Sequence, residues 1–159
     1  MKKDYYIELA GPSDHEQLSE IAIESKRYWE YPEEWIRGWL EELTIQASYL
    51  QSQHTHVYKL TRRSDNLICG FCALEWDSLT EEIEIAHLWI KPEFIGMNLG
   101  KLLLKISLDR VAYLGAKKIT TIADPNATGF YEKFGFKTIS HIESTPAGRL
   151  LPKMVLEMS

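Results

Sequence analysis

The chain has 159 residues, 45% of them hydrophobic and 26% charged, which predicts one soluble globular domain with a sizeable core. Its net charge of −5 gives no electrostatic reason to bind nucleic acid and mildly favours a cationic partner. No apolar run has the length of a signal peptide or a membrane span, so we expect a cytoplasmic protein without membrane attachment.

The first elements follow from hydrophobic period and punctuation. Residues 5–10 predict a strand that ends at Gly11-Pro12, after which Ser13 has the capping-box spacing of a helix reaching about Lys26. A second helix is predicted from Pro32. The apolar stripe of this helix consists of Trp35, Ile36, Trp39, Leu40 and Leu43. Residues 44–55 fit either a loop or a short helical turn.

The rest of the chain alternates strands and helices. Residues 56–62, 67–76 and 82–90 predict an antiparallel meander of three strands. The later elements are a helix at 98–115, a strand at 118–123, a short helix at 124–135, and strands at 136–142 and 152–158. This order predicts an α+β fold. A doubly wound nucleotide-binding fold fits poorly, because the Gly-x-Gly-x-x-Gly pattern is missing.

The two cysteines form a Cys-x-x-Cys pattern. Cys69 and Cys72 lie in the apolar run of residues 67–74, which is typical of a central strand. Residues three apart on a regular strand point to opposite faces, so the two sulfurs should diverge. We therefore predict buried, reduced, structural thiols rather than a redox or zinc site.

A strand that turns into a long helix gives the strongest functional signal. Residues 88–90 are apolar and extended, and Pro92 ends the strand. Gly96, Asn98 and Gly100 follow at a spacing of two, at the start of an apolar helical stripe. Such residues let several backbone N–H groups face one point at a helix N-terminus, which favours a diphosphate ligand.

A second block covers residues 123–136. Asp124 is expected to cap a short helix that begins at Pro125. Phe130 and Tyr131 lie on the inward face of this helix. Tyr131 is therefore either a core aromatic residue or a phenol at the edge of a cofactor groove, where it can donate a proton.

Together the two blocks resemble the GCN5-related N-acetyltransferase (GNAT) family. Residues 95–100 are similar to its pyrophosphate turn, and residues 130–136, Phe-Tyr-Glu-Lys-Phe-Gly-Phe, to its later helix. The tail of residues 148–154 is similar to a bacterial subgroup. The resemblance covers nearly the whole chain. It implies a mixed, mostly antiparallel sheet flanked by helices, with a splay between the fourth and fifth strands, and transfer of an acetyl group from acetyl-coenzyme A.

The resemblance also implies which residues bind this co-substrate. The pantetheine arm would contact the strand end and the amide of Asn126, the turn and helix start would hold the diphosphate, and Tyr131 would reprotonate the leaving thiolate. The expected binding residues are Leu88, Trp89, Ile90, Ile95, Gly96, Met97, Asn98, Leu99, Gly100, Lys101, Asn126 and Tyr131.

Two residues depart from the family pattern. Ile95 replaces the usual Arg or Gln, and Asn98 replaces the middle Gly, although Asn tolerates a positive φ. We expect the backbone cradle to survive. Lys101 either adds charge against a phosphate or is an exposed helix lysine.

Glu84 and His87 are the candidates for taking the proton of the acceptor amine. Strand alternation predicts that they point to opposite faces, so that at most one faces the acceptor. Glu84 is the first choice because a carboxylate also attracts an ammonium group, and His87 is the second because its ordinary pKa lies near neutral. A water chain is a further route, and both residues also fit ordinary strand positions.

In the family, the junction between the opening helices lies over the acceptor channel. Tyr28, Trp29 and Tyr31 are therefore candidate walls for an amine acceptor, either a small molecule or a protein. The alternative is simple packing between helices. The resemblance also makes a homodimer possible. His54 and His56 are too few for a metal site, so no metal is assigned.

Two functions are compatible with these residues. One is an N-acetyltransferase in which a primary amine attacks the thioester directly in a ternary complex. The other is a non-catalytic module of the same fold that binds acyl-coenzyme A as a sensor, which the loss of a basic residue at Ile95 keeps open.

Overall fold

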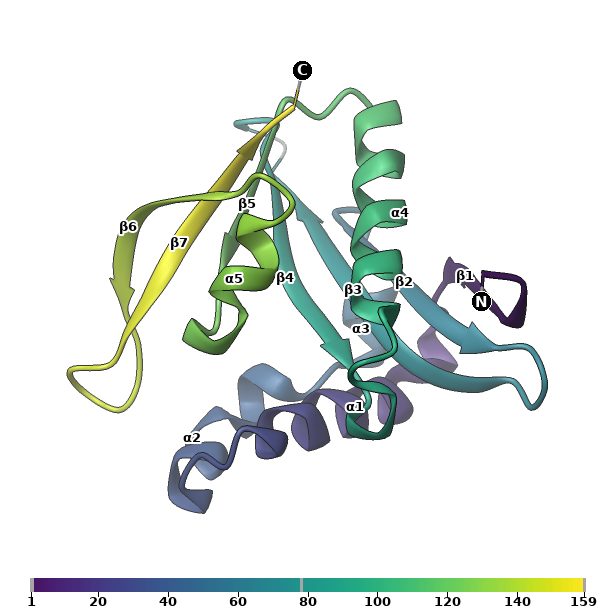
Figure 1. Ribbon diagram of the computed structural model, residues 1–159, viewed down its shortest axis with the longest axis horizontal. Helices are drawn as coiled ribbons and strands as arrows, with labels where there is room; N and C mark the ends of the chain where they lie inside the picture. Colours follow the sequence, from purple (N-terminus) through teal and green to yellow (C-terminus); the bar gives the residue numbers. More distant parts are fainter. Residues whose placement is uncertain (1, 78, 159) are drawn as a thin grey trace.

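The computed structural model describes residues 2–77 and 79–158, in which a seven-stranded sheet carries helices on both faces (Figure 1). The strand order is β1-β2-β3-β4-β5-β7-β6, and β4 and β5 pair in parallel whereas the other neighbours are antiparallel. The strands are β1 (Tyr5–Leu9), β2 (Thr55–Arg62), β3 (Leu67–Trp76), β4 (Ile83–Ile90), β5 (Lys118–Ile122), β6 (Lys137–Glu143) and β7 (Leu150–Glu157). The predicted mixed α+β fold is confirmed.

The helices agree with the predicted segments within a few residues. They are α1 (His15–Tyr28), α2 (Glu33–Leu43), α3 (Ala47–Leu50), α4 (Leu99–Tyr113) and α5 (Thr128–Glu132), with 3-10 turns η1 (Lys2–Asp4), η2 (Pro12–Asp14), η3 (Pro92–Phe94) and η4 (Pro125–Ala127). Within the described residues, no helix has both the length and the apolar character needed to cross a bilayer.

The start of α1 differs from the prediction. Ser13 lies inside the turn η2 rather than capping the helix. The Asp14 carboxylate instead accepts a hydrogen bond from the Gly11 amide, at 2.8 Å. Asp14 also binds Lys59 at 3.0 Å, so a side chain of β2 helps to hold the Asp14 carboxylate at this turn.

The core consists of one apolar cluster on each face of the sheet. On one face, α4 and α5 bury Leu103, Leu104 and Tyr131 against β3, β4 and β7. On the other, α1 and α2 bury Leu18 and Ile36 against residues of β2 and β3. The two faces of β4 therefore have different surroundings.

A β-bulge in β3 corrects the prediction for the cysteines. Leu60 pairs with Gly70 but Thr61 pairs with Ile68, so Cys69 is an extra residue in β3. The bulge shifts the alternation by one, and both thiols pack in the cluster on the α4 face. The prediction of opposite faces is wrong, whereas the prediction of free, buried thiols is confirmed.

A second bulge in β4 corrects the prediction for the candidate bases. Opposite β3, Ala73 pairs with His87 and Leu74 with Ile85, which leaves Ala86 as the extra residue. Glu84 pairs with Glu75, which lies on the same face of β3 as Ala73. Glu84 and His87 therefore lie on the same face of the sheet, the one covered by α1 and α2.

The fourth and fifth strands diverge after a short contact. Their pairing runs from Ile83 with Ile119 to Ile85 with Thr121, and the strands separate beyond it (Figure 1). Helix α1 passes the open end, where the Ser25 hydroxyl donates a hydrogen bond to the Ile90 carbonyl at 2.8 Å. The divergence agrees with the expected splay.

Candidate active site

A cavity of about 590 Å³ occupies the gap between the diverging strands. Its walls come from the end of β4, the turn before α4, the start of α4, the end of β5, and α5. Eleven of the twelve residues predicted to bind the co-substrate line it, and Met97 does not. These residues are Leu88, Trp89, Ile90, Ile95, Gly96, Asn98, Leu99, Gly100, Lys101, Asn126 and Tyr131.

The turn before α4 presents its backbone to this cavity. Gly96 has φ 91° and Asn98 has φ 62°, both in the left-handed region. The Leu102 amide donates to the Asn98 carbonyl at 3.1 Å, so the amides of residues 99–101 have no partner within the helix. The Asn98 side chain does not cap them. Together with the helix dipole, these amides are suited to binding a phosphate group.

Two lysines supply positive charge that Ile95 does not. Lys101 at the start of α4 and Lys133 just after α5 both line the cavity and are exposed. Lys133 was not predicted from the sequence as a binding residue, because it was considered only as part of the second block, residues 123–136. Ile95 lines the cavity with an apolar side chain that is 40% exposed.

Tyr131 lies in the wall of the same cavity and is 5% exposed. Its ring packs edge-on against Phe130 and Phe136. Burial raises the pKa of the phenol well above its usual value, and the nearby Cys72 acts in the same direction, whereas Thr121 opposes the shift. The phenol therefore stays protonated at neutral pH, as a general acid requires.

A second cavity, of about 450 Å³, lies on the other face of β4. It is bounded by the end of α2, by α3 and by the neighbouring strands β3 and β4. Its lining residues are Glu42, Thr44, Ile45, Gln46, Ser48, Tyr49, Glu75 and His87. His87 also lines the first cavity, so this residue borders both cavities.

The surroundings of His87 are unsuited to a general base. The Trp89 indole N–H donates to the His87 Nδ1 at 3.0 Å, which occupies the one lone pair of a neutral imidazole and leaves the proton on Nε2. Burial lowers the pKa of His87 to about 4, although the negative charge of Glu75 opposes this. The expectation of a pKa near neutral is wrong, because burial disfavours the charged ring.

The carboxylates near His87 are the alternative candidates for the general base. Burial raises the pKa of Glu84, and the charge of Glu75 raises it further, whereas Lys153 lowers it. Glu75 accepts a hydrogen bond of 2.6 Å from the Tyr49 hydroxyl. Glu84 lies on this face but lines neither cavity. Glu75 and Tyr49 were missed because their proximity depends on the packing of α3 against the sheet.

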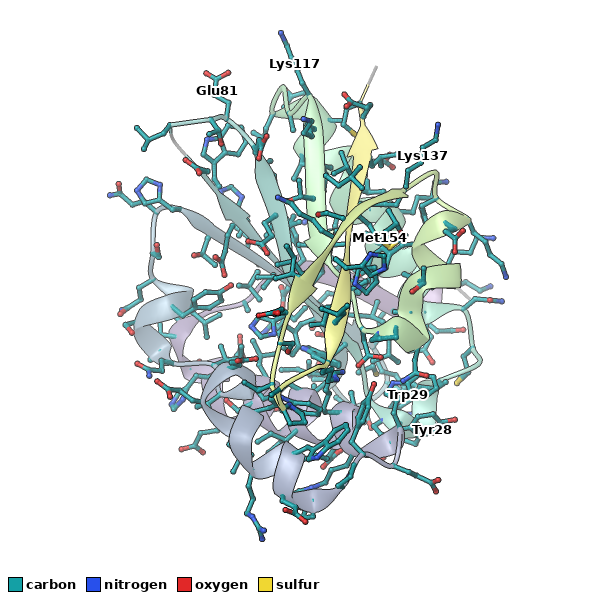
Figure 2. The ribbon with its side chains drawn as sticks, turned by 90° about the vertical axis from the view of Figure 1, so that its left-hand side faces the viewer. Tyr28, Trp29, Glu81, Lys117, Lys137 and Met154 are labelled. Carbon is teal, nitrogen blue, oxygen red and sulfur yellow. The ribbon has the colours of Figure 1, made fainter. Side chains whose placement is uncertain are left out.

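The three aromatic residues predicted to line the acceptor channel, Tyr28, Trp29 and Tyr31, lie in two different environments. Trp29 lines the first cavity, and it packs edge-on against Tyr28 at the surface, where the two rings are 44% and 46% exposed (Figure 2). Tyr28 and Tyr31 do not line either cavity. The Tyr31 hydroxyl instead contacts the Asp124 carboxylate, at 3.0 Å from each oxygen. The Tyr31 ring packs against Trp35 and Trp39 of α2, and Arg149 donates to its hydroxyl at 3.3 Å.

Asn126 lines the first cavity, and Asp124 caps the turn at its side. The Asp124 carboxylate accepts a hydrogen bond from the Asn126 backbone amide at 2.9 Å, as the predicted cap requires. Within the described residues, no group of three or more His, Cys, Asp or Glu side chains is placed to hold a metal ion.

A comparison with protein families identifies the arrangement. The family model described as "Acetyltransferase (GNAT) domain" matches residues 19–158. The chain belongs to the GNAT acetyltransferase family. No curated protein shows significant sequence similarity to this GNAT chain.

Solved structures support the same fold. PaiA N-acetyltransferase from Thermoplasma acidophilum, in complex with coenzyme A, has a TM-score of 0.75 and 21% identity, covering 99% of this chain and 100% of that chain. Ribosomal-protein-S18-alanine N-acetyltransferase from Escherichia coli has a TM-score of 0.73 and 16% identity, with coverages of 98% and 94%. A spermidine N-acetyltransferase variant from Vibrio cholerae has a TM-score of 0.71 and 18% identity, with coverages of 98% and 95%.

Proposed function

We propose that this GNAT protein transfers an acetyl group from acetyl-coenzyme A to a primary amine, by direct attack of the amine in a ternary complex. The observation that carries the proposal is that β4 separates two cavities of different chemistry, both of which His87 lines. One cavity combines a backbone anion site with a buried phenol, and the other is lined by carboxylates. Each suits one of the two substrates.

The first cavity fits acetyl-coenzyme A. The free amides of residues 99–101 suit the diphosphate, with Lys101 and Lys133 adding charge. The open edges of β4 and β5 suit an extended pantetheine arm between them. When bound, this co-substrate supplies a thioester that is reactive toward amines. Within the same cavity, the Tyr131 hydroxyl donates its proton to the departing sulfur.

The acceptor's proton leaves on the opposite face of β4. Glu84 has a raised pKa, which suits a base, and it pairs across the strands with Glu75. Because Glu84 lines neither cavity, the proton reaches it through water. His87 remains neutral. Its Nε2–H is a donor fixed by Trp89, so its role is to orient polar groups at the junction rather than to accept a proton.

The lining of the second cavity favours a cationic amine. Glu42 and Glu75 supply negative charge, and Tyr49 holds the Glu75 carboxylate in place. An ammonium group remote from the attacking amine can pair with these carboxylates, which favours a diamine or polyamine. The similar protein from Vibrio cholerae is named for spermidine acetylation, in agreement with this class.

The test is to measure the release of free coenzyme A in the presence of matched diamines and neutral monoamines. We expect acceptor-dependent turnover, with a lower KM for the diamines. A Glu75→Gln variant should raise KM for diamines and leave KM for acetyl-coenzyme A unchanged, whereas Glu132→Gln on the exposed end of α5 serves as the control. Binding of acetyl-coenzyme A without turnover on any amine would favour the sensor function instead.

A further inference from the structure

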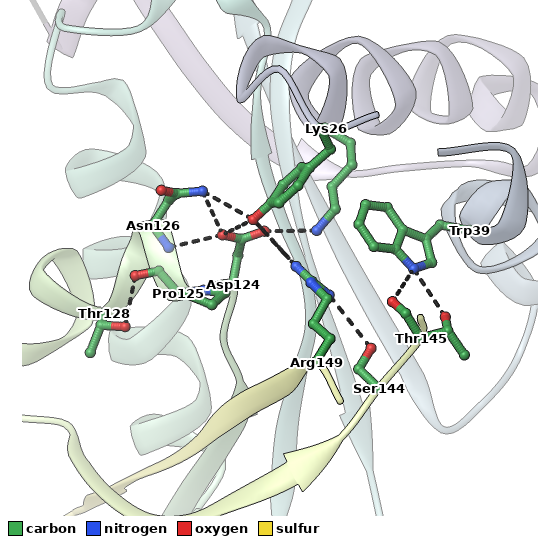
Figure 3. Close-up of polar contacts among 10 residues, drawn as sticks. Lys26, Trp39, Asp124, Pro125, Asn126, Thr128, Ser144, Thr145 and Arg149 are labelled. Atoms are coloured by element: carbon green, nitrogen blue, oxygen red, sulfur yellow. Dashed lines mark hydrogen bonds and ion pairs between the residues drawn. The ribbon is translucent and has the colours of Figure 1, made fainter. Parts of the chain in front are cut away.

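A polar cluster joins four separate segments at the edge of the first cavity. We call it the Asp124 cluster; its members are Lys26 of α1, Tyr31 before α2, Asp124 after β5, and Arg149 before β7. Figure 3 shows Lys26 and Arg149 converging on Asp124. The Lys26 Nζ lies 2.7 Å from one Asp124 oxygen, and an Arg149 guanidinium nitrogen lies 3.5 Å from the same oxygen. Two cations therefore share one carboxylate.

Aromatic rings enclose the charges of this cluster. The Lys26 ammonium lies 4.6 Å from the centre of the Trp39 ring, and the Arg149 guanidinium lies 4.5 Å from it. The Trp39 indole N–H donates to the Thr145 carbonyl oxygen at 3.0 Å, which fixes the loop that carries Arg149. The Lys26 and Asp124 side chains are 10% and 12% exposed, so this ion pair is shielded from water.

The cluster also uses both hydrogens of the Asn126 side-chain amide. Its nitrogen lies 3.1 Å from the Tyr31 hydroxyl oxygen and 3.0 Å from an Asp124 carboxylate oxygen (Figure 3). Turning the amide over would place its carbonyl oxygen against the carboxylate, which is unfavourable. Among the contacts of the described residues, the Asn126 carbonyl oxygen has no donor, and Asn126 lines the first cavity.

We propose that Tyr31 and Asp124, held in place by Lys26 and Arg149, are positioning residues that orient the Asn126 amide so that its carbonyl oxygen accepts a hydrogen bond from an amide N–H of the pantetheine arm. This inference rests on the proposed function, because it assumes that the cavity binds coenzyme A. It assigns the cluster a role in recognition beyond holding the helices together.

Two ligands can distinguish a role of the Asp124 cluster in ligand recognition from a purely structural role. Coenzyme A contains the pantetheine amides, whereas adenosine 3′-phosphate 5′-diphosphate contains only the nucleotide half and should contact the backbone turn alone. Calorimetric Kd values for both ligands would be measured on the parent chain, Tyr31→Phe, Asn126→Ala and the double variant. Tyr28→Phe, an exposed tyrosine outside the cluster, is the matched control.

We expect Tyr31→Phe and Asn126→Ala each to weaken coenzyme A binding about three- to tenfold, the value of one hydrogen bond. Binding of the nucleotide half should stay within about twofold of the parent. The double variant should bind coenzyme A no more weakly than Asn126→Ala alone, because both changes remove the same contact. Lys26→Arg, which keeps the charge and a donor, should bind more tightly than Lys26→Met.

The inference is overturned if Tyr31→Phe binds coenzyme A like the parent. It is also overturned if both ligands weaken equally, which would indicate a structural role, or if the two single effects add. In each of these cases the parent still binds coenzyme A, so the proposed function stands. A folded parent that binds neither ligand would overturn the proposed function and this inference together.

Discussion

The two faces of β4 differ in the kind of chemical groups that they present. The α4 face presents main-chain amides at a helix start and one buried phenol, Tyr131, to the first cavity. The α1 face carries the side chains of Glu75, Glu84 and His87, whose properties depend on burial and on nearby charge. The backbone site depends on a few consecutive residues, including Gly96 and Gly100, whereas the side-chain cluster forms only when distant segments pack together.

The largest expected effect is the loss of the acid on the α4 face. Tyr131→Phe should lower kcat about a thousandfold, since the thiolate then leaves without its proton donor, while the Kd for acetyl-coenzyme A changes little. Steady-state kinetics and calorimetry check this. Tyr113→Phe, at a site that is 91% exposed, is the control. Parental kcat in Tyr131→Phe would exclude Tyr131 as the general acid.

The next effect concerns the Asp124 cluster at the edge of the first cavity. Asp124→Asn should lower the free energy of unfolding by about 3 kcal/mol at pH 7, because Lys26 and Arg149 then lose their shared counter-charge in a buried site. Urea unfolding measures it. Asp65→Asn, in an exposed pair with Arg62, should change stability little.

The same variant should show a defined pH dependence. Burial alone would raise the pKa of Asp124, but the hydrogen bond and charge of Lys26 hold it below its ordinary value of 3.8. The carboxylate therefore contributes stability above about pH 3.8, and this contribution is lost as the pH falls through the lower pKa of the folded state. The difference between parent and variant should shrink in that range; a difference constant with pH would contradict this account.

A smaller effect tests the proton acceptor on the α1 face. Glu84→Gln should lower kcat/KM about a hundredfold by removing the base. Since the pKa of Glu84 is raised above its ordinary 4.5, the parent should gain activity as the pH rises through that raised value, and the variant should lose this limb. The pH profile of His87→Gln should keep the limb. Its disappearance there would make His87 the base.

The smallest effect concerns the left-handed turn on the α4 face. Asn98→Val should cost about 1–2 kcal/mol of stability, because a branched side chain is strained at φ 62°, and it should weaken coenzyme A binding. Asn98→Gly should preserve both, since glycine adopts this conformation freely. Thermal unfolding and calorimetry separate the two outcomes. Equal stability of the Val and Gly variants would indicate that the turn is not held in this form.

Part of this organisation could be predicted from the sequence because it depends on neighbours in the chain. The turn from Gly96 to Gly100, the cap at Asp124 and the inward face of Tyr131 each depend on a few consecutive residues. Strand faces could not be predicted across Cys69 or Ala86, because each is an extra residue in a β-bulge and shifts the alternation that follows. Tyr31 was expected at an acceptor wall, but Asp124 and Arg149, far away in sequence, draw it into the cluster.

Local sequence sets the order of elements, the glycine-containing helix start and the aromatic helix that follows β5, since backbone conformation and hydrophobic period are local properties. Which titratable groups meet depends instead on how distant segments pack. The tertiary structure placed Glu84 and His87 on the same face, paired His87 with Trp89, and assembled Lys26, Asp124 and Arg149 from three distant segments. Pairing register and burial depend on the whole sheet, and they set both the direction of a side chain and the pKa of its titratable group.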